Sequence, residues 1–430
     1  MLALVLTFLF FLIMGTHLGI ALALGGVACV YLVTGYSFDF VIQSFLFFLH
    51  KYPLMAVPFF ILAGFLMERT GLIRQIFDFA ESLLKFLPGG LGAAAMATCM
   101  VFAAITGSSV AMASAMAVIA IPVMRQRGYD EALASGIVCS GGTLGLLIPP
   151  SITLIVYGVI TETSIVHLFM AGMVPGVVLG SLFIGVIIII AIRRGFRPEP
   201  TELKRIGTTF VRAIGGLLFP VLVLGGLYGG VFTPTEAGAA ACGYALLYGL
   251  ITGRLNFAKK LPEILTSSLQ LTTVVFLLVG GAGIFVKVAA IEYIPQHFAE
   301  FIIGLGLTPL TFVFAYMVVL LILGCFLDAM GMIVLTVPII FPVAMTLGIN
   351  PLHLGVLITI NSELGCITPP VGLNLYAVSG LSKIPIATVL RGSLPFFLVG
   401  FAFLIFMVFT PTLALWFPHL IHPPIVWGGG

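Results

Sequence analysis

The sequence predicts an all-α membrane protein built as two inverted-topology repeats, and three observations support this prediction. The 430 residues are 61% hydrophobic and only 8% charged, whereas soluble domains carry about 25% charged residues. The chain also matches itself at a constant offset of 220 residues. In addition, basic loops of one copy correspond to loops without Lys or Arg in the other copy.

Apolar runs recur along the whole chain and are long enough for many membrane crossings. A spanning helix needs about 20 predominantly apolar residues, so a chain of this length has room for roughly ten crossings and their connectors. The first run, residues 1–31, has no basic region before it and no small-residue cleavage site. We therefore expect it to be the first spanning helix and not a signal peptide.

The internal match contains eleven identities in one ungapped frame, including a doubled proline at 149–150 and again at 369–370. Such a set is hard to attribute to chance, even in a chain rich in Gly and Pro. The residues of the first copy that recur 220 positions later are Met112, Pro122, Val123, Gly128, Leu144, Gly145, Pro149, Pro150, Gly172, Pro175 and Gly180.

Charge predicts that the two copies have opposite orientations. Short cytoplasmic loops carry an excess of Lys and Arg. Loop 125–128 contains two arginines, whereas its counterpart 345–348 has no charge. Further along, 161–167 lacks Lys and Arg, while its counterpart contains Lys383. Inverted repeats of this kind are typical of secondary transporters.

The polar segments outside the repeats' apolar runs have their own predicted places. Residues 193–212 hold six Lys or Arg, so we place this linker in the cytoplasm. Two helices over 213–252 follow it. Segments 69–88 and 289–308 mix charged and apolar residues at helical spacing. They are predicted to be amphipathic helices at the membrane interface, with plain loops as the alternative.

Four short polar stretches interrupt apolar runs, and they form two equivalent pairs at 106–109 with 328–331 and at 141–151 with 361–370. The apolar arms beside the first pair have about 15 residues each, which is short for a crossing. Re-entrant hairpins with polar tips at mid-membrane are the expected solution. The Pro-Pro dipeptides remove two adjacent backbone donors, so the helices that carry them must break.

These breaks supply groups that bind ions. Freed carbonyls and the hydroxyls of Ser108, Ser109, Thr143 and Thr368 are oxygen ligands suited to Na⁺, and the helix N-termini that follow each break favour a carboxylate. The alternative is that the Gly and Ser residues only allow close helix packing.

Two acidic residues, Asp328 and Glu363, lie within these polar stretches. Ionisable residues at membrane depth are costly and usually functional. Asp328 is predicted either to coordinate Na⁺ or to accept a hydrogen bond from the substrate, and Glu363 either to join the site or to cap a helix N-terminus. The sequence shows no nucleophile motif and no metal-ligand spacing, so an enzyme is not expected.

With these residues located, the sequence resembles a known family, the large membrane subunit (DctM-type) of tripartite ATP-independent periplasmic (TRAP) transporters. The resemblance runs nearly end to end, and the stretches 229–237 and 363–374 are its most specific parts. It departs from the family at 14–19, where His17 stands in place of a proline or small apolar residue. The matching stretches are 107–109, 145–151, 229–237 and 363–374.

The resemblance implies an elevator-type transporter driven by two or more Na⁺ ions in the bacterial inner (cytoplasmic) membrane. It implies a small four-helix membrane subunit and a periplasmic solute-binding protein as partners. The substrate-binding residues carried over by motif are Ser108, Ser109, Ser151 and Asp328. The first Na⁺ site comprises Gly107, Ser108, Ser109, Gly142, Thr143 and Pro149. The second comprises Asp328, Ala329, Gly331, Gly365, Thr368 and Pro370.

The same resemblance predicts a division of the chain into scaffold and transport parts. The transport domain is expected to consist of two halves, each with one hairpin and one broken helix. The predicted segments are 1–90 (scaffold helices and first arm helix), 91–192 (first transport half), 193–212 (linker), 213–310 (scaffold helices and second arm helix), 311–415 (second transport half) and 416–430 (C-terminal tail).

The predicted function is Na⁺-coupled uptake of a small organic acid delivered by the binding protein. The alternative is a stand-alone Na⁺/dicarboxylate symporter or an antiporter, which would not need a binding protein. A channel is disfavoured because it does not require paired broken helices that meet at closed tips. Sialate, C4-dicarboxylates and other carboxylates all fit two hydroxyl-lined tips and one acidic side chain, so the substrate stays open.

Overall fold

The structure is a computed structural model that describes residues 2–31, 36–253 and 257–421. Within these ranges the regular elements are helices, as the sequence predicts, and no strand occurs among them. The first part of the chain forms α1 (Leu2–Ile13), α2 (Leu18–Cys29), α3 (Phe38–Leu49), the 3₁₀ helix η2 (Tyr52–Met55), α4 (Ala56–Arg69), α5 (Leu72–Leu84), α6 (Gly90–Thr106), α7 (Ser109–Gln126), α8 (Glu131–Leu147), α9 (Ile152–Thr161) and α10 (Ile165–Arg193).

The second part repeats this order of helices at the offset seen in the sequence. The helix α16 begins and ends 220 residues after α7, and α15, α17, α18 and α19 follow α6, α8, α9 and α10 at nearly the same spacing. The second part comprises α11 (Leu203–Tyr228), α12 (Pro234–Ile251), α13 (Phe257–Ile291), α14 (Ile294–Gly304), α15 (Pro309–Gly324), α16 (Ala329–Thr346), α17 (Pro351–Gly365), α18 (Leu373–Ser382), α19 (Ile386–Phe409) and α20 (Pro411–Ile421).

The prediction of a single spanning helix over residues 1–31 is wrong. This segment is a helical hairpin whose two helices, α1 and α2, have 12 residues each. A Cβ on Gly25 would lie 2.9 Å from the Cα of Phe8, so the two helices are in backbone contact. The turn is made by Met14 and Gly15, and Gly15 has a φ of 79°. A glycine adopts this left-handed conformation without steric cost, and the chain reverses there.

One long helix of the second copy is interrupted in the first copy. The 35 residues of α13 correspond to α3, η2 and α4 together. Proline 53 lies in η2, where the second copy has Thr273. Proline lacks the backbone N–H that a continuous helix needs at this position, which accounts for the bend between α3 and α4.

Two helical hairpins and two broken helices form the centre of the molecule. The hairpins are α6–α7 and α15–α16, and the broken helices are α8–α9 and α17–α18, interrupted around the Pro-Pro dipeptides as predicted. The packing crosses between the copies, because α7 packs against α18 and α16 packs against α9. The two copies are therefore interleaved and do not form separate bodies.

Two predicted boundaries differ from the structure. Linker 193–212 is shorter than predicted, since α10 extends to Arg193 and α11 begins at Leu203. The predicted tail 416–430 begins inside α20, and its residues 422–430 lie outside the described part of the chain. The predicted arm segments 69–88 and 289–308 do contain helices, α5 and α14.

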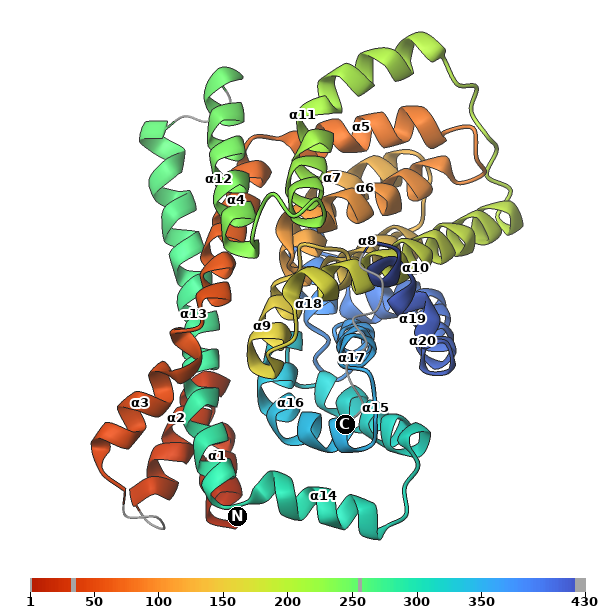
Figure 1. Cartoon of the computed structure of the whole chain (residues 1–430). Coiled ribbons are helices and arrows are strands. Elements are labelled where there is room, and N and C mark those ends of the chain that lie inside the picture. Colours follow the sequence, from red (N-terminus) through yellow and green to blue (C-terminus); the bar gives the residue numbers. More distant parts are fainter. Residues whose placement is uncertain (1, 32–35, 254–256, 422–430) are drawn as a thin grey trace.

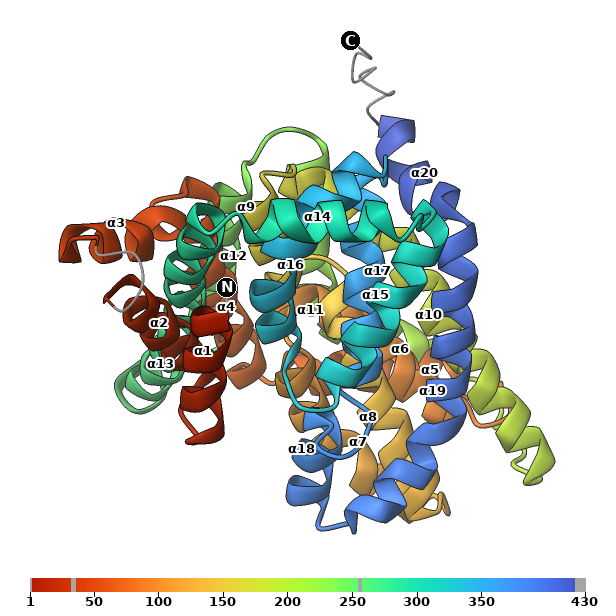
Figure 2. The same ribbon diagram turned by 90° about the horizontal axis from the view of Figure 1, so that it is seen from below.

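Eight helical stretches among the described residues are long and apolar enough to cross a membrane. This is fewer than the ten expected, because several apolar helices, among them α2, α3, α6 and α15, have only 12 to 17 residues. Figure 1 shows α5 and α14 at opposite ends of the molecule. In Figure 2, α1, α2, α3 and α13 form one group, and α14 runs from this group across to α15.

Candidate functional site

The tip of the first hairpin is formed by Gly107 and Ser108. Gly107 ends α6 in the left-handed conformation with a φ of 58°, a conformation that favours glycine. Ser108 is extended and precedes α7, whose N-terminus has no side-chain cap. The first N–H groups of a helix lack partners within the helix, so this end of α7 presents free donors beside the tip.

The first tip packs closely against the first broken helix. A Cβ on Gly107 would lie 2.7 Å from the carbonyl oxygen of Pro150. Cβ atoms on Gly142 and Gly145 would lie 3.1 Å from the carbonyl oxygens of Ser109 and Ser108, respectively. Three glycines thus leave room for backbone carbonyls to approach α8 and the break after it.

The tip of the second hairpin contains Asp328. This residue is the N-cap of α16, and its Oδ1 accepts a hydrogen bond from the Gly331 N–H at 3.1 Å. Asp and Asn are preferred N-caps because the side-chain oxygen satisfies one of the unpaired donors of the first turn. Asp328 is half-buried and begins the second arm of the hairpin.

The second tip packs against the second broken helix by equally close contacts. A Cβ on Gly365 would lie 2.7 Å from the Cα of Gly324, so the two backbones touch. The Val371 N–H donates to the Cys325 carbonyl oxygen at 3.1 Å, across the gap between the tip and the break. Each tip is therefore held by the broken helix of its own copy.

Asn374 joins the two copies at the centre. It lies in the first turn of α18 and is fully buried. Its Nδ2 donates to Ser109 Oγ at 2.7 Å and to the Cys139 carbonyl oxygen at 3.3 Å. Within the described residues its Oδ1 has no hydrogen-bond partner. Buried amide oxygens are normally satisfied, so this oxygen is a free ligand group beside the first tip.

Three further residues show that both tips converge on one region. Leu146 of the first break, Ala329 of the second hairpin and Cys366 of the second break form a small buried cluster. Asn374 lies in the family motif 363–374, but the sequence pattern predicts no role for it. The bounds of α9 and α18 differ by 221 residues, so Asn374 lies opposite Thr153, which is also polar and buried.

Glu363 lies inside α17, whose N-cap is Asn350, so it does not cap its own helix. Its side chain is 1% exposed and lies near the backbone of Leu147. Neither carboxyl oxygen has a hydrogen-bond partner in the described region. In the first copy the equivalent position is Thr143. Because the first copy has no acidic residue at this position, only the second copy contributes a carboxyl group here. This group belongs to the second broken helix and lies next to the first broken helix.

Several predicted site residues make their contacts elsewhere. The Thr143 hydroxyl donates to the Ser140 carbonyl oxygen at 2.7 Å, and the Thr368 hydroxyl donates to that of Leu364 at 2.6 Å. Ser151 is buried and caps α9.

The carbonyl that approaches the first tip belongs to Pro150, not to the predicted Pro149. Pro370 is exposed. The two Na⁺ sites stay predictions.

Residues outside the hairpins also face the tips. A Cβ on Gly64 of α4 would lie 3.3 Å from the Cα of Thr106, just before the first tip. Glu68, one turn further along α4, lines a small pocket with Thr106 and Ser108. At the second tip, a Cβ on Gly331 would lie 2.5 Å from Leu18 Cδ2, at the start of α2.

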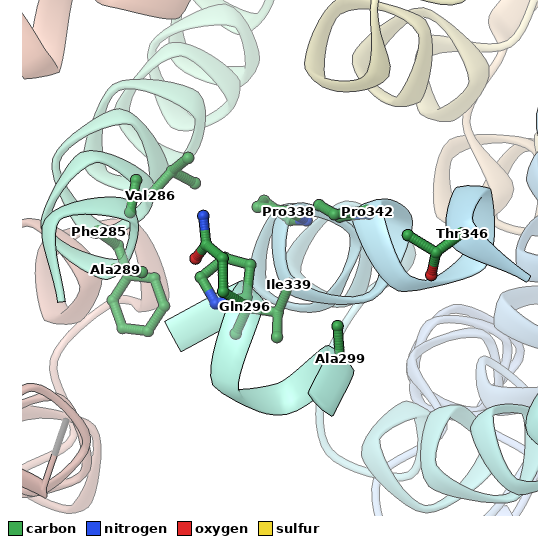
Figure 3. Close-up of a pocket in the computed structure, with 11 residues that line it drawn as sticks. Phe285, Val286, Ala289, Gln296, Ala299, Pro338, Ile339, Pro342 and Thr346 are labelled. Atoms are coloured by element: carbon green, nitrogen blue, oxygen red, sulfur yellow. The ribbon is translucent and has the colours of Figure 1, made fainter. Parts of the chain in front are cut away.

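Two larger cavities lie away from the tips. One of about 390 Å³ lies between α13, α14 and α16 and is lined mainly by carbon, with Gln296 and Thr346 as its polar side chains (Figure 3). The other, of about 510 Å³, shares Phe285 and Ile339 with it and reaches α1 and α15. Apolar linings of this kind do not select a carboxylate, so neither cavity is the predicted substrate site.

Ion pairs hold the outer ends of the helices. Arg127 at the end of α7 contacts Glu199 at 2.6 Å and Glu81 of α5 at 3.5 Å. Lys51, before η2, pairs with Glu162 after α9. The hydrogen bond and positive charge of Lys51 lower the pKa of the exposed Glu162 carboxyl. Exposed pairs contribute little to stability, but Arg127 connects the end of α7 to α5, and Lys51 connects the start of η2 to the end of α9.

Comparison with known proteins gives consistent matches. Residues 5–413 match the family model described as tripartite ATP-independent periplasmic transporter, DctM component. The chain is 42% identical over 369 residues to the C4-dicarboxylate TRAP transporter large permease protein DctM of Pseudomonas aeruginosa, which covers 86% of each chain. It is 34% identical over 414 residues to the isethionate TRAP transporter permease protein DctMQ of Oleidesulfovibrio alaskensis, which covers 95% of this chain and 65% of that one.

A solved structure has a similar fold. The crystal structure of the Alcanivorax borkumensis YdaH transporter superposes with a TM-score of 0.59 over 86% of each chain. Sequence identity to it is 15%. This similarity supports the all-helical fold alone and says nothing about the substrate.

Proposed function

The chain belongs to the DctM component family of tripartite ATP-independent periplasmic transporters, and from this premise we propose that it carries out Na⁺-coupled uptake of a small organic acid. Its relatives are transporter permeases, so the chain is a multi-pass membrane transporter and not an enzyme. The finer parts of this proposal are the substrate class, the coupling ion and the movement.

The observation that carries the proposal is the pair of equivalent hairpin tips, each packed on a broken helix. Secondary transporters bind substrate and ions at discontinuous helices near the membrane midplane. Here the tips at Gly107–Ser108 and Cys325–Asp328 contact their breaks through glycine backbones. If the helix breaks served only for packing, an amide oxygen without a hydrogen-bond partner would not be needed beside them. The unpaired Oδ1 of Asn374 therefore supports a binding role.

The substrate carboxylate is proposed to bind where two uncapped helices meet. The N-termini of α7 and α18 have no side-chain cap, whereas Asp328 and Ser151 cap α16 and α9. The bond between Asn374 and Ser109 brings α18 and α7 together. The positive ends of the two helix dipoles and the first N–H groups of α7 favour an anion there, whereas at α18 the Asn374 and Leu375 N–H groups already donate to the carbonyl oxygens of Cys366 and Gly372.

We propose that a sodium ion binds beside the first tip. Carbonyl oxygens of Ser108, Ser109 and Pro150 face glycines, and the free Oδ1 of Asn374 lies nearby. Neutral oxygen donors of this kind suit hard cations. Around the second tip, Asp328, Gly331, Gly365 and Thr368 would supply the ligands. When bound, the ions neutralise substrate charge, which is costly to carry through the bilayer.

Movement is proposed to follow an elevator scheme between inverted repeats. The arm helices α5 and α14 lie at opposite ends of the molecule (Figure 1), which is the arrangement that two oppositely oriented copies require. The hairpins and broken helices pack on one another across the copies, which favours motion of this unit as a rigid body. The scaffold would comprise the helices of 1–90 and 213–310, among them α1, α2, α3 and α13.

The proposed partners are a small membrane subunit and a periplasmic binding protein, with the chain in a bacterial inner membrane. The similar DctMQ protein extends well beyond the segment matched by this chain. We propose that a small membrane subunit works together with this chain. The family description itself refers to a tripartite periplasmic transporter.

Uptake in proteoliposomes tests this proposal. The chain and its small subunit are reconstituted and offered radiolabelled organic acids, with and without a Na⁺ gradient and the cognate binding protein. Uptake that requires both is the expected result. Uptake with Na⁺ but without the binding protein would support the stand-alone symporter, and uptake indifferent to Na⁺ would contradict the proposed cation sites.

A further inference from the structure

The two larger cavities adjoin one another between α13 and the second hairpin. They have volumes of about 390 and 510 Å³, and both are lined by Phe285 of α13 and Ile339 of α16. Ligand pockets of proteins have volumes of about 300–1,000 Å³, so each cavity is large enough to hold a bound molecule. The proposed substrate site lies at the hairpin tips, so these cavities have a separate use.

The polar groups that a ligand can reach lie at one end of this space. In the first cavity they are the side chains of Gln296 of α14 and Thr346 of α16, and the Gln296 amide points between α13 and α16 (Figure 3). In the second cavity, the Thr336 hydroxyl donates to the Met332 carbonyl oxygen and accepts from the Tyr316 hydroxyl, each at 2.7 Å. These two hydroxyls are satisfied within the protein, so the second cavity is suited to hydrocarbon.

The second cavity reaches the outer apolar surface of the molecule. Leu9 of α1 and Val319 of α15 line it, and they are 40% and 48% exposed, respectively. Apolar cavities do not hold ordered water. In a membrane-spanning chain the surrounding solvent is lipid hydrocarbon, which is as apolar as a leucine side chain. A lipid chain can therefore enter between α1 and α15 without loss of hydrogen bonds.

We propose that this space binds one acyl chain of a membrane glycerophospholipid, with the chain in the second cavity and the ester end beside Gln296 and Thr346. The arm helix α14 is predicted to lie in the membrane interface, which is the level of the lipid esters. Phe285 belongs to the proposed scaffold and Ile339 to the second hairpin. The bound chain thus fills the space between two parts that are proposed to move against one another. The binding itself does not depend on the proposed function.

The lining predicts selection by chain length and not by headgroup charge. Among the described residues, no Lys, Arg or His lines either cavity, and cationic side chains are what would select an anionic headgroup. Each buried CH₂ group of a lipid chain strengthens binding about fourfold. A chain that is four carbons shorter should therefore bind at least tenfold more weakly, whereas exchange of the headgroup should change the affinity little.

Three substitutions test the location of the chain. Ile339→Trp places a larger side chain where the two cavities adjoin. Ala315→Phe narrows the entrance to the second cavity, and because Ala315 is exposed, the fold should tolerate this change. Val318→Trp on the same helix is the matched control, since Val318 is 58% exposed and lines neither cavity.

Native mass spectrometry counts the phospholipids that the purified complex of this chain and its small subunit retains after washing with detergent. Dipalmitoleoyl and dilauroyl phosphatidylethanolamine, and the corresponding phosphatidylglycerols, are then added back at equal mole fractions, and the melting temperature is followed. The wild type and Val318→Trp should retain one lipid per chain and show a saturable rise in melting temperature with the longer lipid. Ile339→Trp and Ala315→Phe should bind it at least fivefold more weakly.

Three results would overturn this inference. Equal retention by the wild type, Ile339→Trp and Ala315→Phe would place the lipid elsewhere on the surface. A wild-type complex that retains no lipid would mean that another occupant, such as the small subunit, covers this space. Affinity that follows the headgroup and not the chain length would contradict an acyl-chain site. If Ile339→Trp does not fold, Ala315→Phe decides alone. None of these readouts measures uptake, so the proposed function is tested separately.

Discussion

Asn374 Nδ2 lies 2.7 Å from Ser109 Oγ, and this bond joins the second broken helix to the first hairpin across 265 residues of sequence. Both side chains are buried. The contact connects the two uncapped helix N-termini at which the substrate carboxylate is proposed to bind, so it should matter for uptake as well as for stability.

The two residues are predicted to be energetically coupled. Removal of the partner of a buried polar group costs about 1–3 kcal/mol, and residues in one hydrogen-bond network show coupling of about 0.5–3 kcal/mol. Ser109→Ala and Asn374→Ala should each lower thermal stability and Na⁺-dependent uptake. The double variant should lose less than the sum of both. Additive losses in a double-mutant cycle would show that the bond carries no coupling.

Gly365→Ala is predicted to disrupt the second site. The added Cβ would lie 2.7 Å from the backbone of Gly324, which cannot rotate away as a side chain can. Overpacking of this kind costs about 1–3 kcal/mol, so both the melting temperature and uptake should fall.

Gly185→Ala in α10 is the matched control for this substitution, because a Cβ added there would meet no atom within 4 Å apart from the neighbouring backbone of its own helix. Alanine is favoured over glycine in a helix interior by about 0.5–1 kcal/mol, and the control should be neutral or slightly stabilising. Equal effects of the two substitutions would argue against the close packing of Gly324 and Gly365.

Asp328→Asn is expected to remove the negative charge of this side chain while it keeps the cap on α16. Asn caps helices as well as Asp does, so the bond to the Gly331 N–H and the fold should persist. Loss of a charged hydrogen-bond acceptor costs about 1.5–3 kcal/mol, which corresponds to a reduction in uptake of about 10- to 100-fold. Near-normal uptake by this variant, at wild-type expression and melting temperature, would remove Asp328 from the site.

The pair of Lys51 and Glu162 is predicted to give a stability that depends on pH. Because Lys51 lowers the pKa of Glu162 in the folded protein, the unfolded state binds the proton more readily. The contribution is therefore present above the usual pKa of glutamate and is lost as the pH falls through the lowered value.

Thermal unfolding of the purified protein between pH 3 and 7 would reveal this dependence. The substitution Lys51→Met should flatten the acidic part of the curve, and high salt should have a similar effect because the pair is exposed. Arg125→Met, which removes the exposed pair with Glu131 inside the first copy, is the control. An acidic limb unchanged by Lys51→Met would mean that other carboxyls account for it.

Local patterns in the sequence were sufficient to predict most of the helices and their breaks. The Pro-Pro dipeptides, the 220-residue offset and the polar interruptions predict the hairpins and broken helices, because each depends on hydropathy and backbone chemistry within a few residues. The same reasoning failed for residues 1–31, since an apolar run has the same composition whether it spans once or folds back at Gly15.

By itself the sequence determined the membrane setting, the repeated order of helices and the positions of the polar tips, since these follow from composition and spacing along the chain. Only the tertiary structure decided which groups meet. The pairing of Asn374 with Ser109, the contact of Gly324 with Gly365 and the approach of Leu18 to Gly331 join distant segments. Such contacts depend on how helices pack in three dimensions, and packing leaves no periodic signal in a uniformly apolar chain.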